Sequence, residues 1–209
     1  MIDYLRDPAA IYEASFAIIR AEASLSRFSK IEQTVATRII HACGMTDVAD
    51  DLRFSHGAVG AGIDALADGA TVLCDVRMVR HGVIAGRMPA GNAIACPLDR
   101  DGIEVHAQEI GTTRTAAALD LARDEWGGAV VAVGNAPTAL FHLLEAVAAG
   151  APRPALVIGM PVGFVGAVES KDALMRSDLP FLAVRGRRGG SAMASAAVNA
   201  LAGIAGTGR

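Results

Sequence analysis

The stretch "AVVAVGNAPTAL", residues 129–140, sets the expected fold of this 209-residue chain. Its first six residues form a continuous apolar run, which is typical of a strand that is buried on both faces of a parallel sheet. Gly134 and Asn135 then predict a turn. Pro137 predicts the first turn of a helix that extends to about residue 149. A buried strand that leads directly into a helix is the repeating unit of an α/β fold.

The same alternation continues along the chain. Four more apolar runs of strand length lie at residues 71–75, 92–98, 155–160 and 181–186, and helical patterns occupy residues 57–68, 113–125, 166–177 and 191–203. We therefore expect an α/β, Rossmann-like fold with three layers, in which an open, mainly parallel sheet carries helices on both faces. Residues 1–209 are expected to form a single domain. The last eight residues are expected to fray.

Two helices are expected before the first of these strands. Asp7 and Pro8 suit the start of the first helix. Ser29 and Glu32 have the spacing of a capping box at the start of the second. Gly44 is placed to end that helix in the left-handed conformation. His41, within "RIIHACG" (residues 38–44), then lies in the last helical turn, where the helix dipole favours a protonated imidazole.

Composition excludes several classes of protein. The net charge of −3 without a basic block argues against a nucleic-acid partner. No apolar run reaches the ~18 residues of a membrane span, and no signal peptide is visible, so we expect a cytoplasmic protein without a membrane partner. The three cysteines lie far apart in the sequence, which predicts free thiols and no zinc site. The other four histidines lack metal-ligand spacing, and His142 is expected to be hydrogen-bonded and partly buried.

The loops that follow the predicted strands are the expected ligand site, because ligands of open α/β sheets bind at the carboxyl ends of the strands. Neither "GMPVGFVG" (159–166) nor "GRRGGSA" (186–192) matches a nucleotide-binding fingerprint. Cationic side chains in or near these loops would instead suit carboxylates: Arg20, Arg87, Arg114, Lys171, Arg187 and Arg188. His41 is the candidate general acid, and the alternative is that it only caps a helix carbonyl.

Five longer stretches, in this order, carry a resemblance to a known family. They are "IYEASFAIIRAEASLSRFS" (11–29), "IIHACG" (39–44), "GNAPTALFHLLE" (134–145), "GMPVGFVGAVESK" (159–171) and "RGRRGGSAMASAAVNAL" (185–201). Together they resemble the precorrin-8X methylmutases, or precorrin isomerases, of cobalamin biosynthesis. The similarity extends over nearly the whole chain.

The resemblance implies an isomerase that moves a methyl group between adjacent carbons of ring C by a sigmatropic shift. This step converts precorrin-8X to hydrogenobyrinate without a cofactor or catalytic metal. His41 matches the family's proton donor and acceptor, and Ser15 matches a substrate contact. Further substrate-binding residues assigned on this basis are Tyr12, Arg20, Arg87, Pro89, Asn92, Arg114, Asn135, Lys171, Arg187, Gly190 and Ser191. The expected partners are the tetrapyrrole and a second copy of the chain, in a homodimer with shared sites.

Three alternatives stay open at this point. The chain could be a tetrapyrrole carrier without catalysis, which would need the arginines and glycines but not His41. It could act on the cobalt-containing form of the same substrate. It could also be an unrelated α/β enzyme that binds a phosphorylated ligand at residues 186–192.

Overall fold

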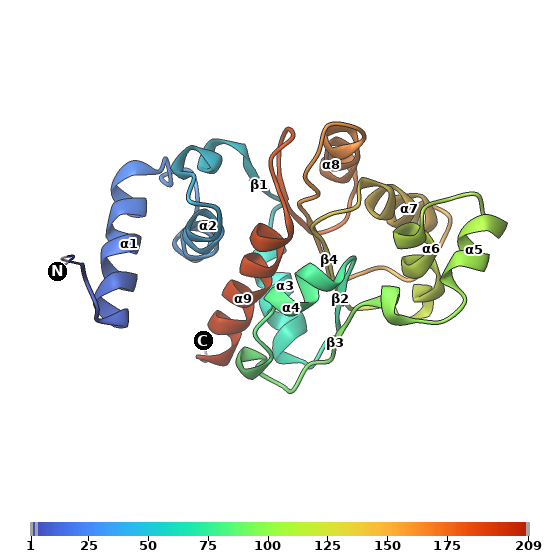
Figure 1. The fold of residues 1–209 in the computed structure, drawn as a ribbon, viewed down its shortest axis with the longest axis horizontal. Helices are drawn as coiled ribbons and strands as arrows, with labels where there is room; N and C mark the ends of the chain where they lie inside the picture. Colours follow the sequence, from blue (N-terminus) through green and yellow to red (C-terminus); the bar gives the residue numbers. More distant parts are fainter. Residues whose placement is uncertain (1, 3, 208–209) are drawn as a thin grey trace.

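A six-stranded, mostly parallel sheet forms the centre of the computed structural model, which describes residues 2 and 4–207 (Figure 1). The strand order is β1-β6-β5-β4-β2-β3. The strands are β1 (Leu52–Phe54), β2 (Val72–Cys74), β3 (Ile94–Ala95), β4 (Val130–Val133), β5 (Leu156–Gly159) and β6 (Phe181–Val184). All neighbours pair in parallel except β1, which lies antiparallel to β6 at one edge.

Helices cover both faces of this sheet. They are α1 (Pro8–Glu22), α2 (Lys30–Cys43), α3 (Ala58–Ala67), α4 (Arg77–Gly82), α5 (Ile103–Glu109), α6 (Arg114–Leu121), α7 (Pro137–Ala148), α8 (Ala167–Arg176) and α9 (Ser191–Gly206). Short 3-10 turns join them: η1 (Thr46–Asp51), η2 (Ala85–Arg87), η3 (Pro97–Asp99) and η4 (Arg123–Glu125). Within the described part of the chain, no helix has the length and hydropathy to cross a membrane.

Alternate side chains of the parallel strands enter two separate cores. Val130 and Ala132 of β4 join a cluster that includes residues of α2, α3 and α9. Val131 and Val133 join a cluster on the other face with residues of α7 and α8. Both faces are therefore apolar, which explains why the strands read as continuous apolar runs in the sequence.

The five predicted strands and the mainly parallel α/β architecture are confirmed. Strand β1 was missed, because three residues with an arginine in the middle carry no recognisable strand pattern. Helices α4 and α5 were also missed, because segments of 6 and 7 residues are too short to show a helical pattern of apolar residues. The predicted helix 113–125 ends earlier, at Leu121. The predicted fraying is wrong for residues 202–206, which continue α9, while residues 208–209 lie outside the described part.

A buried carboxylate joins the ends of two strands. Asp75 follows β2 directly and is 2% exposed. Its carboxylate accepts hydrogen bonds from the backbone N–H groups of Gly134 (3.0 Å), Asn135 (2.8 Å) and Ala136 (2.8 Å). Burial raises the pKa of Asp75, while these donors act in the opposite direction. The carboxylate thus fixes the turn between β4 and α7 at the carboxyl edge of the sheet.

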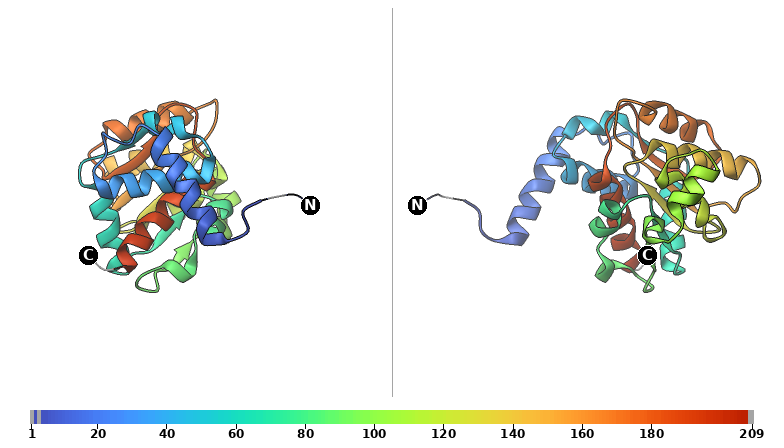
Figure 2. Two further views of the ribbon diagram at one scale, coloured as in Figure 1. Left: turned by 90° about the vertical axis from the view of Figure 1, so that its left-hand side faces the viewer. Right: turned by 45° about the vertical axis from the view of Figure 1, so that its right-hand side comes forward.

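Helix α1 stands at the margin of the molecule and packs mainly against α2 (Figure 2). Ile19 is its one buried residue. Apolar side chains on and before α1 remain exposed to solvent: Tyr4, Leu5, Ile11 and Ile18. A helix with apolar residues on the face away from its own chain has a surface suited to packing against another molecule.

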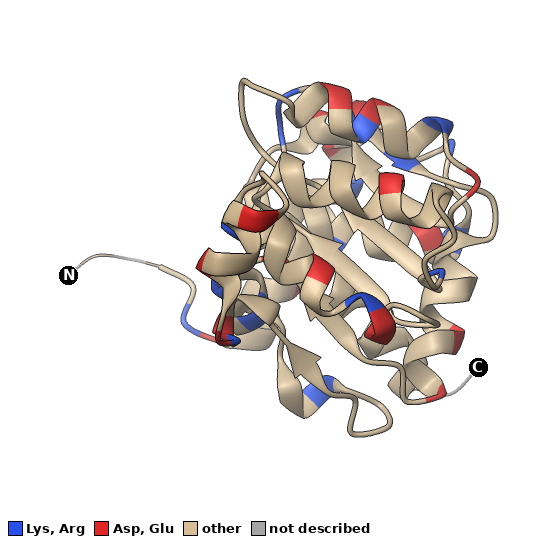
Figure 3. Ribbon diagram, turned by 90° about the vertical axis from the view of Figure 1, so that its right-hand side faces the viewer, with Lys and Arg blue, Asp and Glu red and all other residues tan. Residues whose placement is uncertain are grey.

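A polar cluster joins α5, α6 and α7 at the opposite end of the sheet. The Asp120 carboxylate lies 2.7 Å from Nε2 of His106 and 2.7 Å from Nε2 of His142, and it also accepts from Arg123. The prediction that His142 is hydrogen-bonded and partly buried is confirmed. Acidic and basic residues are mixed over this side of the molecule (Figure 3). Burial alone would raise the pKa of Asp120, but these three partners outweigh it and lower the pKa to about 2.

We expect Asp120→Asn to destabilise the protein in a pH-dependent way. Because the folded-state pKa of about 2 lies below the ordinary value of 3.8, the stabilisation is complete above roughly pH 4 and is lost as the pH falls toward 2. Urea unfolding near pH 6 should show a loss of about 1–2 kcal/mol, and this loss should shrink toward pH 3. Asp124→Asn, on an exposed residue of η4, is the matched control. A loss that is independent of pH would contradict this role for the carboxylate.

Candidate active site

The site is built on helix α2, whose two ends are fixed by local interactions. Ser29 and Glu32 form the predicted capping box, with Ser29 N–H donating to the Glu32 carboxylate at 2.8 Å. At the other end, Gly44 has φ 69° and donates its N–H to the Ile40 carbonyl at 2.8 Å. The predicted capping box and the predicted left-handed end at Gly44 are both confirmed. His41 therefore lies in the last turn of a helix that ends at a defined residue.

Aromatic side chains of α1 surround the His41 imidazole. Its ring centroid lies 5.2 Å from that of Tyr12 and 5.4 Å from that of Phe16, which it meets edge to face. The Arg38 guanidinium lies 5.0 Å above the Tyr12 ring and donates to the Tyr12 hydroxyl. These contacts restrict the orientation of the imidazole, although His41 itself remains exposed.

His41 opens into a hollow between α1 and α2 with a volume of about 340 Å³. The residues that line it are Ser15, Ile18, Ile19, Glu22, Ile40, His41, Gly44 and Thr46. The structure thus brings together Ser15 and His41, which are 26 positions apart. Glu22 also lies here, and its carboxylate accepts from the Thr46 hydroxyl at 3.3 Å. The sequence carried no signal for Glu22 or Thr46, because only the crossing of α1 over α2 places them beside His41.

Ion pairs hold this end of α2 at the carboxyl edge of the sheet. The Arg188 guanidinium lies 2.8 Å from the Asp47 carboxylate and 3.2 Å from that of Asp51. The Arg185 N–H donates to the Asp51 carbonyl at 2.8 Å. The turn after His41 is therefore joined to the loop after β6, which is the edge where the sequence analysis expected ligands.

The loop after β6 packs tightly against the loop after β5. Gly189 has φ 156°, and a Cβ atom there would lie 2.3 Å from the Met160 carbonyl oxygen. The Gly190 N–H donates to that same oxygen at 2.8 Å. Arg187 extends outward, with its guanidinium 5.3 Å above the exposed Phe164 ring. Only glycine allows this approach of two backbones, and Ser191 then begins α9.

Two residues assigned to substrate binding are buried and hydrogen-bonded within the protein. Lys171 is fully buried, and its ammonium donates to the Arg188 carbonyl at 2.7 Å. Burial lowers its pKa to about 8. Asn92 is 7% exposed, and its side-chain amide donates to the carbonyls of Leu66 and Ala70. Their assignment to substrate binding stays a prediction, and both polar groups have hydrogen-bond partners within the protein.

The remaining assigned residues are spread along the molecule. Arg20 lines a smaller hollow between α1 and α2, and Arg87 lines a cavity beside α9. Pro89 is half-buried in the loop after η2. Asn135 has an exposed side chain beside the Asp75 turn. Arg114 pairs with Glu104 at 2.9 Å on α6, which lies across the sheet from α2 (Figure 1). One chain therefore does not bring all of these residues around His41.

Comparison with known proteins identifies the family. The family model described as precorrin-8X methylmutase matches residues 10–204. The chain belongs to the precorrin-8X methylmutase family. It is 58% identical over 204 residues to the precorrin-8X methylmutase of Pseudomonas aeruginosa, covering 97% of this chain and 98% of that one. The precorrin-8X methylmutase of a Sinorhizobium species is 56% identical, covering 96% of both chains.

Solved structures agree with the sequence comparison. The crystal structure of precorrin-8X methylmutase from Thermus thermophilus superposes with a TM-score of 0.86 at 42% identity, over 95% of this chain and 98% of that one. Six relatives named cobalt-precorrin-8 methylmutase are 31–38% identical to this chain. The family match includes residues 186–192, so the alternative of an unrelated enzyme with a phosphate site there is wrong.

We expect Gly44→Ala to lower the free energy of unfolding by about 1 kcal/mol, because an L-residue at this positive φ is strained. No atom lies within 4 Å of the added Cβ, so the loss would report backbone strain alone. Gly60→Ala is the matched control: its Cβ is equally free, but it lies inside α3 at an ordinary φ. That variant should gain about 0.5–1 kcal/mol. If urea unfolding showed the same change in the free energy of unfolding for Gly44→Ala and Gly60→Ala, the left-handed cap at Gly44 would be refuted.

Proposed function

We propose that the chain is a precorrin-8X methylmutase. It would move one methyl group between adjacent carbons of ring C and release hydrogenobyrinate as an isomer of its substrate. Substrate and product have the same atoms and electrons, so the reaction consumes no cofactor. The observation that carries the proposal is the position of His41, which lines the same hollow between α1 and α2 as Ser15.

His41 is proposed as the proton donor and acceptor. Protonation of the conjugated macrocycle would make it electron-poor and ease the methyl shift, and the same imidazole would take the proton back afterwards. The chain of aromatic contacts with Tyr12 and Phe16 supports this role, because a general acid acts only from a defined position. Holding a flexible macrocycle in one geometry would supply further rate acceleration.

The carboxylate arms of the substrate are the proposed partners of the cationic residues. Arg20, Arg87, Arg114 and Arg187 all have exposed side chains that could reach a ligand. Gly190 precedes α9 and Ser191 begins it without a side-chain cap, so the N–H groups of the first helical turn, from Ser191 onward, could bind an anion. We include Tyr12, Ser15, Pro89 and Asn135 in the same substrate surface.

The metal-free substrate is favoured over the cobalt form. Relatives named for metal-free precorrin-8X are 56–58% identical to this chain, whereas the six named for the cobalt form reach 38% at most. The proposal also includes a cytoplasmic location. The three free cysteines, two of them buried, suit a reducing compartment.

A homodimer with shared sites completes the proposal. Helix α1 exposes apolar residues, and α6, which begins with Arg114, lies on the other side of the sheet from α2 (Figure 1). A second copy packed on α1 would cover the apolar surface, and it could bring its own α6 to this hollow.

We expect Ile11→Asp to weaken this dimer, because Ile11 is a 42% exposed apolar residue of α1 and a charge there would be buried in the contact. Sedimentation equilibrium should give the mass of two chains for the unaltered protein and a shift toward one chain for the variant. Ala67→Asp, at an exposed apolar residue at the end of α3, is the control and should leave the mass unchanged. A single-chain mass for the unaltered protein would exclude the dimer.

We expect His41→Ala to fold and bind the tetrapyrrole but to turn over at least ~100-fold more slowly. The measurement is a visible-absorption time course with precorrin-8X, since the shift changes the conjugated system. His56→Ala, at another exposed histidine, should match the unaltered protein.

The outcomes separate the remaining alternatives. Near-normal turnover by His41→Ala would remove its acid–base role. Binding without turnover by the unaltered protein would favour the carrier. Turnover of the cobalt-containing substrate alone would favour the cobalt form.

A further inference from the structure

Three large apolar side chains extend into solvent from the loop between β5 and α8. Phe164 is 82% exposed, Val165 is 90% exposed and Val162 is 47% exposed. Single exposed apolar residues are ordinary, but a group of them in one short loop indicates a surface that contacts another molecule. The loop directly follows β5, at the edge of the sheet where ligands of open α/β folds bind.

Backbone packing holds both ends of this loop. The Gly163 N–H donates to the Arg187 carbonyl at 3.2 Å. Gly166 lies against the start of α7, where an added Cβ atom would be 3.4 Å from the Cβ atom of Pro137. The Phe164 ring therefore extends from an attached loop, and its exposure does not come from a free end of the chain.

A guanidinium group lies beside this apolar surface. The Arg187 side chain covers part of the Phe164 ring, with its guanidinium 5.3 Å from the ring centroid, while most of the ring stays exposed. An apolar ring system with carboxylate arms has an apolar face and a charged rim. An exposed aromatic ring next to a guanidinium matches both parts of such a ligand.

The same loops are joined to the hollow that contains His41. Thr46 lines that hollow, and the next residue, Asp47, pairs with Arg188 at 2.8 Å. Arg188 directly follows Arg187, whose carbonyl holds the loop between β5 and α8. The apolar surface thus lies on the loop that packs against the loop attached to the rim of the His41 hollow.

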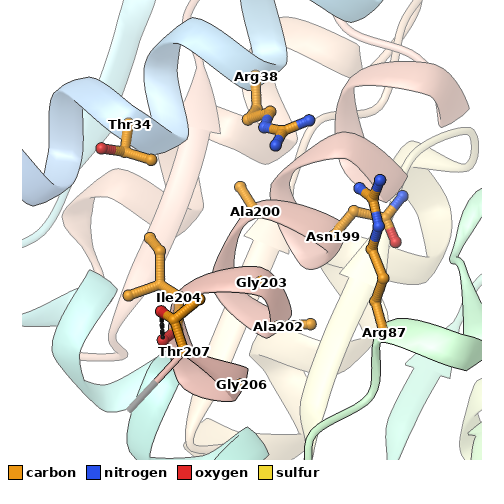
Figure 4. A pocket seen from close by; sticks show the side chains of 10 residues that line it. All are labelled: Thr34, Arg38, Arg87, Asn199, Ala200, Ala202, Gly203, Ile204, Gly206 and Thr207. Atoms are coloured by element: carbon orange, nitrogen blue, oxygen red, sulfur yellow. Dashed lines mark hydrogen bonds between the residues drawn. The ribbon is translucent and has the colours of Figure 1, made fainter. Parts of the chain in front are cut away.

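The cavity beside α9 provides no comparable apolar surface. Its volume is about 500 Å³, and Figure 4 shows two arginine side chains beside the short side chains of α9. Within the described part of the chain, none of the residues that line it is aromatic. The rings of Tyr12 and Phe16 pack against the His41 imidazole. Phe164 therefore stands apart as an aromatic ring at the carboxyl edge that its own chain leaves mostly uncovered.

We propose that Phe164 and Val165 form a contact surface for the apolar face of the tetrapyrrole ring system. This inference rests on the proposed function and adds a contact that recognises the ring system and not its carboxylate arms. Burial of the two side chains against the ligand removes apolar area from water, which stabilises the complex without any charge.

The first test is binding of hydrogenobyrinate, followed by its visible absorption, to variants of the full chain. Phe164→Ala should weaken binding roughly 10- to 100-fold, because it removes most of the apolar contact. Phe164→Leu should fall between, since it keeps part of the buried area. The control is Leu121→Ala, at a 40% exposed apolar residue at the end of α6, and it should bind as the unaltered chain does.

A carboxylate-free probe separates contact with the ring system from an effect through Arg187. The fully methyl-esterified corrinoid should lose the same factor of affinity on Phe164→Ala as the free acid does. Arg187→Ala should weaken binding of the free acid alone, because only the free acid has charges to pair. A loss on Phe164→Ala that is confined to the free acid would show that Phe164 only positions Arg187, and it would overturn the proposal.

A chemical probe tests the contact without using activity. The thiol introduced by Val165→Cys should react with iodoacetamide in the free protein, as measured by the mass of the peptide that contains position 165. Hydrogenobyrinate at about ten times its Kd should slow this reaction roughly 10-fold, because only the free site can react. Ala67→Cys, at an exposed residue at the end of α3, is the control and should react equally with and without the ligand.

Other results would overturn the contact surface. Equal affinity of Phe164→Ala and the unaltered chain for hydrogenobyrinate would exclude it, as would full reactivity of Val165→Cys in the complex. Unchanged affinity together with a lowered sedimentation mass would assign the loop to a contact with a second chain. If the unaltered chain converts precorrin-8X while Phe164→Ala binds hydrogenobyrinate normally, the contact surface fails and the proposed function stands. If the unaltered chain neither binds hydrogenobyrinate nor converts precorrin-8X, both fail.

Discussion

A sheet buried on both faces is the constraint on which the rest of this structure depends. Every strand side chain from β4 to β6 is buried, so no polar chemistry can be placed on the faces of the sheet. Polar groups collect at the carboxyl edge, where the chain leaves each strand. Asp75 is the buried carboxylate at this edge, and its three N–H donors hold the ends of β2 and β4 in register. The loops that carry the candidate site residues start from this fixed frame.

Helix α2 connects that frame to the hollow of the proposed site. Thr34, Arg38 and His41 follow one another at spacings of four and three residues, which places them along one side of the helix. His41 serves the hollow toward α1, while Thr34 and Arg38 line the cavity toward α9. Because Gly44 and the Ser29–Glu32 box fix both ends of α2, the separation between the proton donor and the guanidinium is also fixed. A rigid helix holds side chains at fixed spacings, which suits the binding of a large ligand with several arms.

A buried charge helps to hold the loops beyond β5 and β6 in place. Lys171 reaches the Arg188 carbonyl from below, and the Arg188 side chain reaches Asp47 and Asp51 at the turn after His41. This pair of residues joins α8, the loop after β6 and η1. The apolar outer surface of α1 has no comparable partner within the described part of the chain. The protein thus has a rigid frame at the sheet and a helix, α1, whose outer surface is available to another molecule.

The sequence by itself determined the parts of this protein that depend on neighbouring residues. Apolar runs of strand length gave the five parallel strands, and Ser29, Glu32 and Gly44 gave both ends of α2 because capping involves residues only three or four positions apart. The motif "IIHACG" placed His41 in its helical turn. The sequence could not give β1, which pairs with a strand 130 residues later, nor the burial of Lys171 and Asn92, whose polar groups meet carbonyls far away in the chain. Only the tertiary structure decided which arginines share a cavity. Arg38 and Arg87 come from different elements, and both line one cavity because Asn199 attaches the loop that carries Arg87 to α9, through contacts that no local pattern encodes.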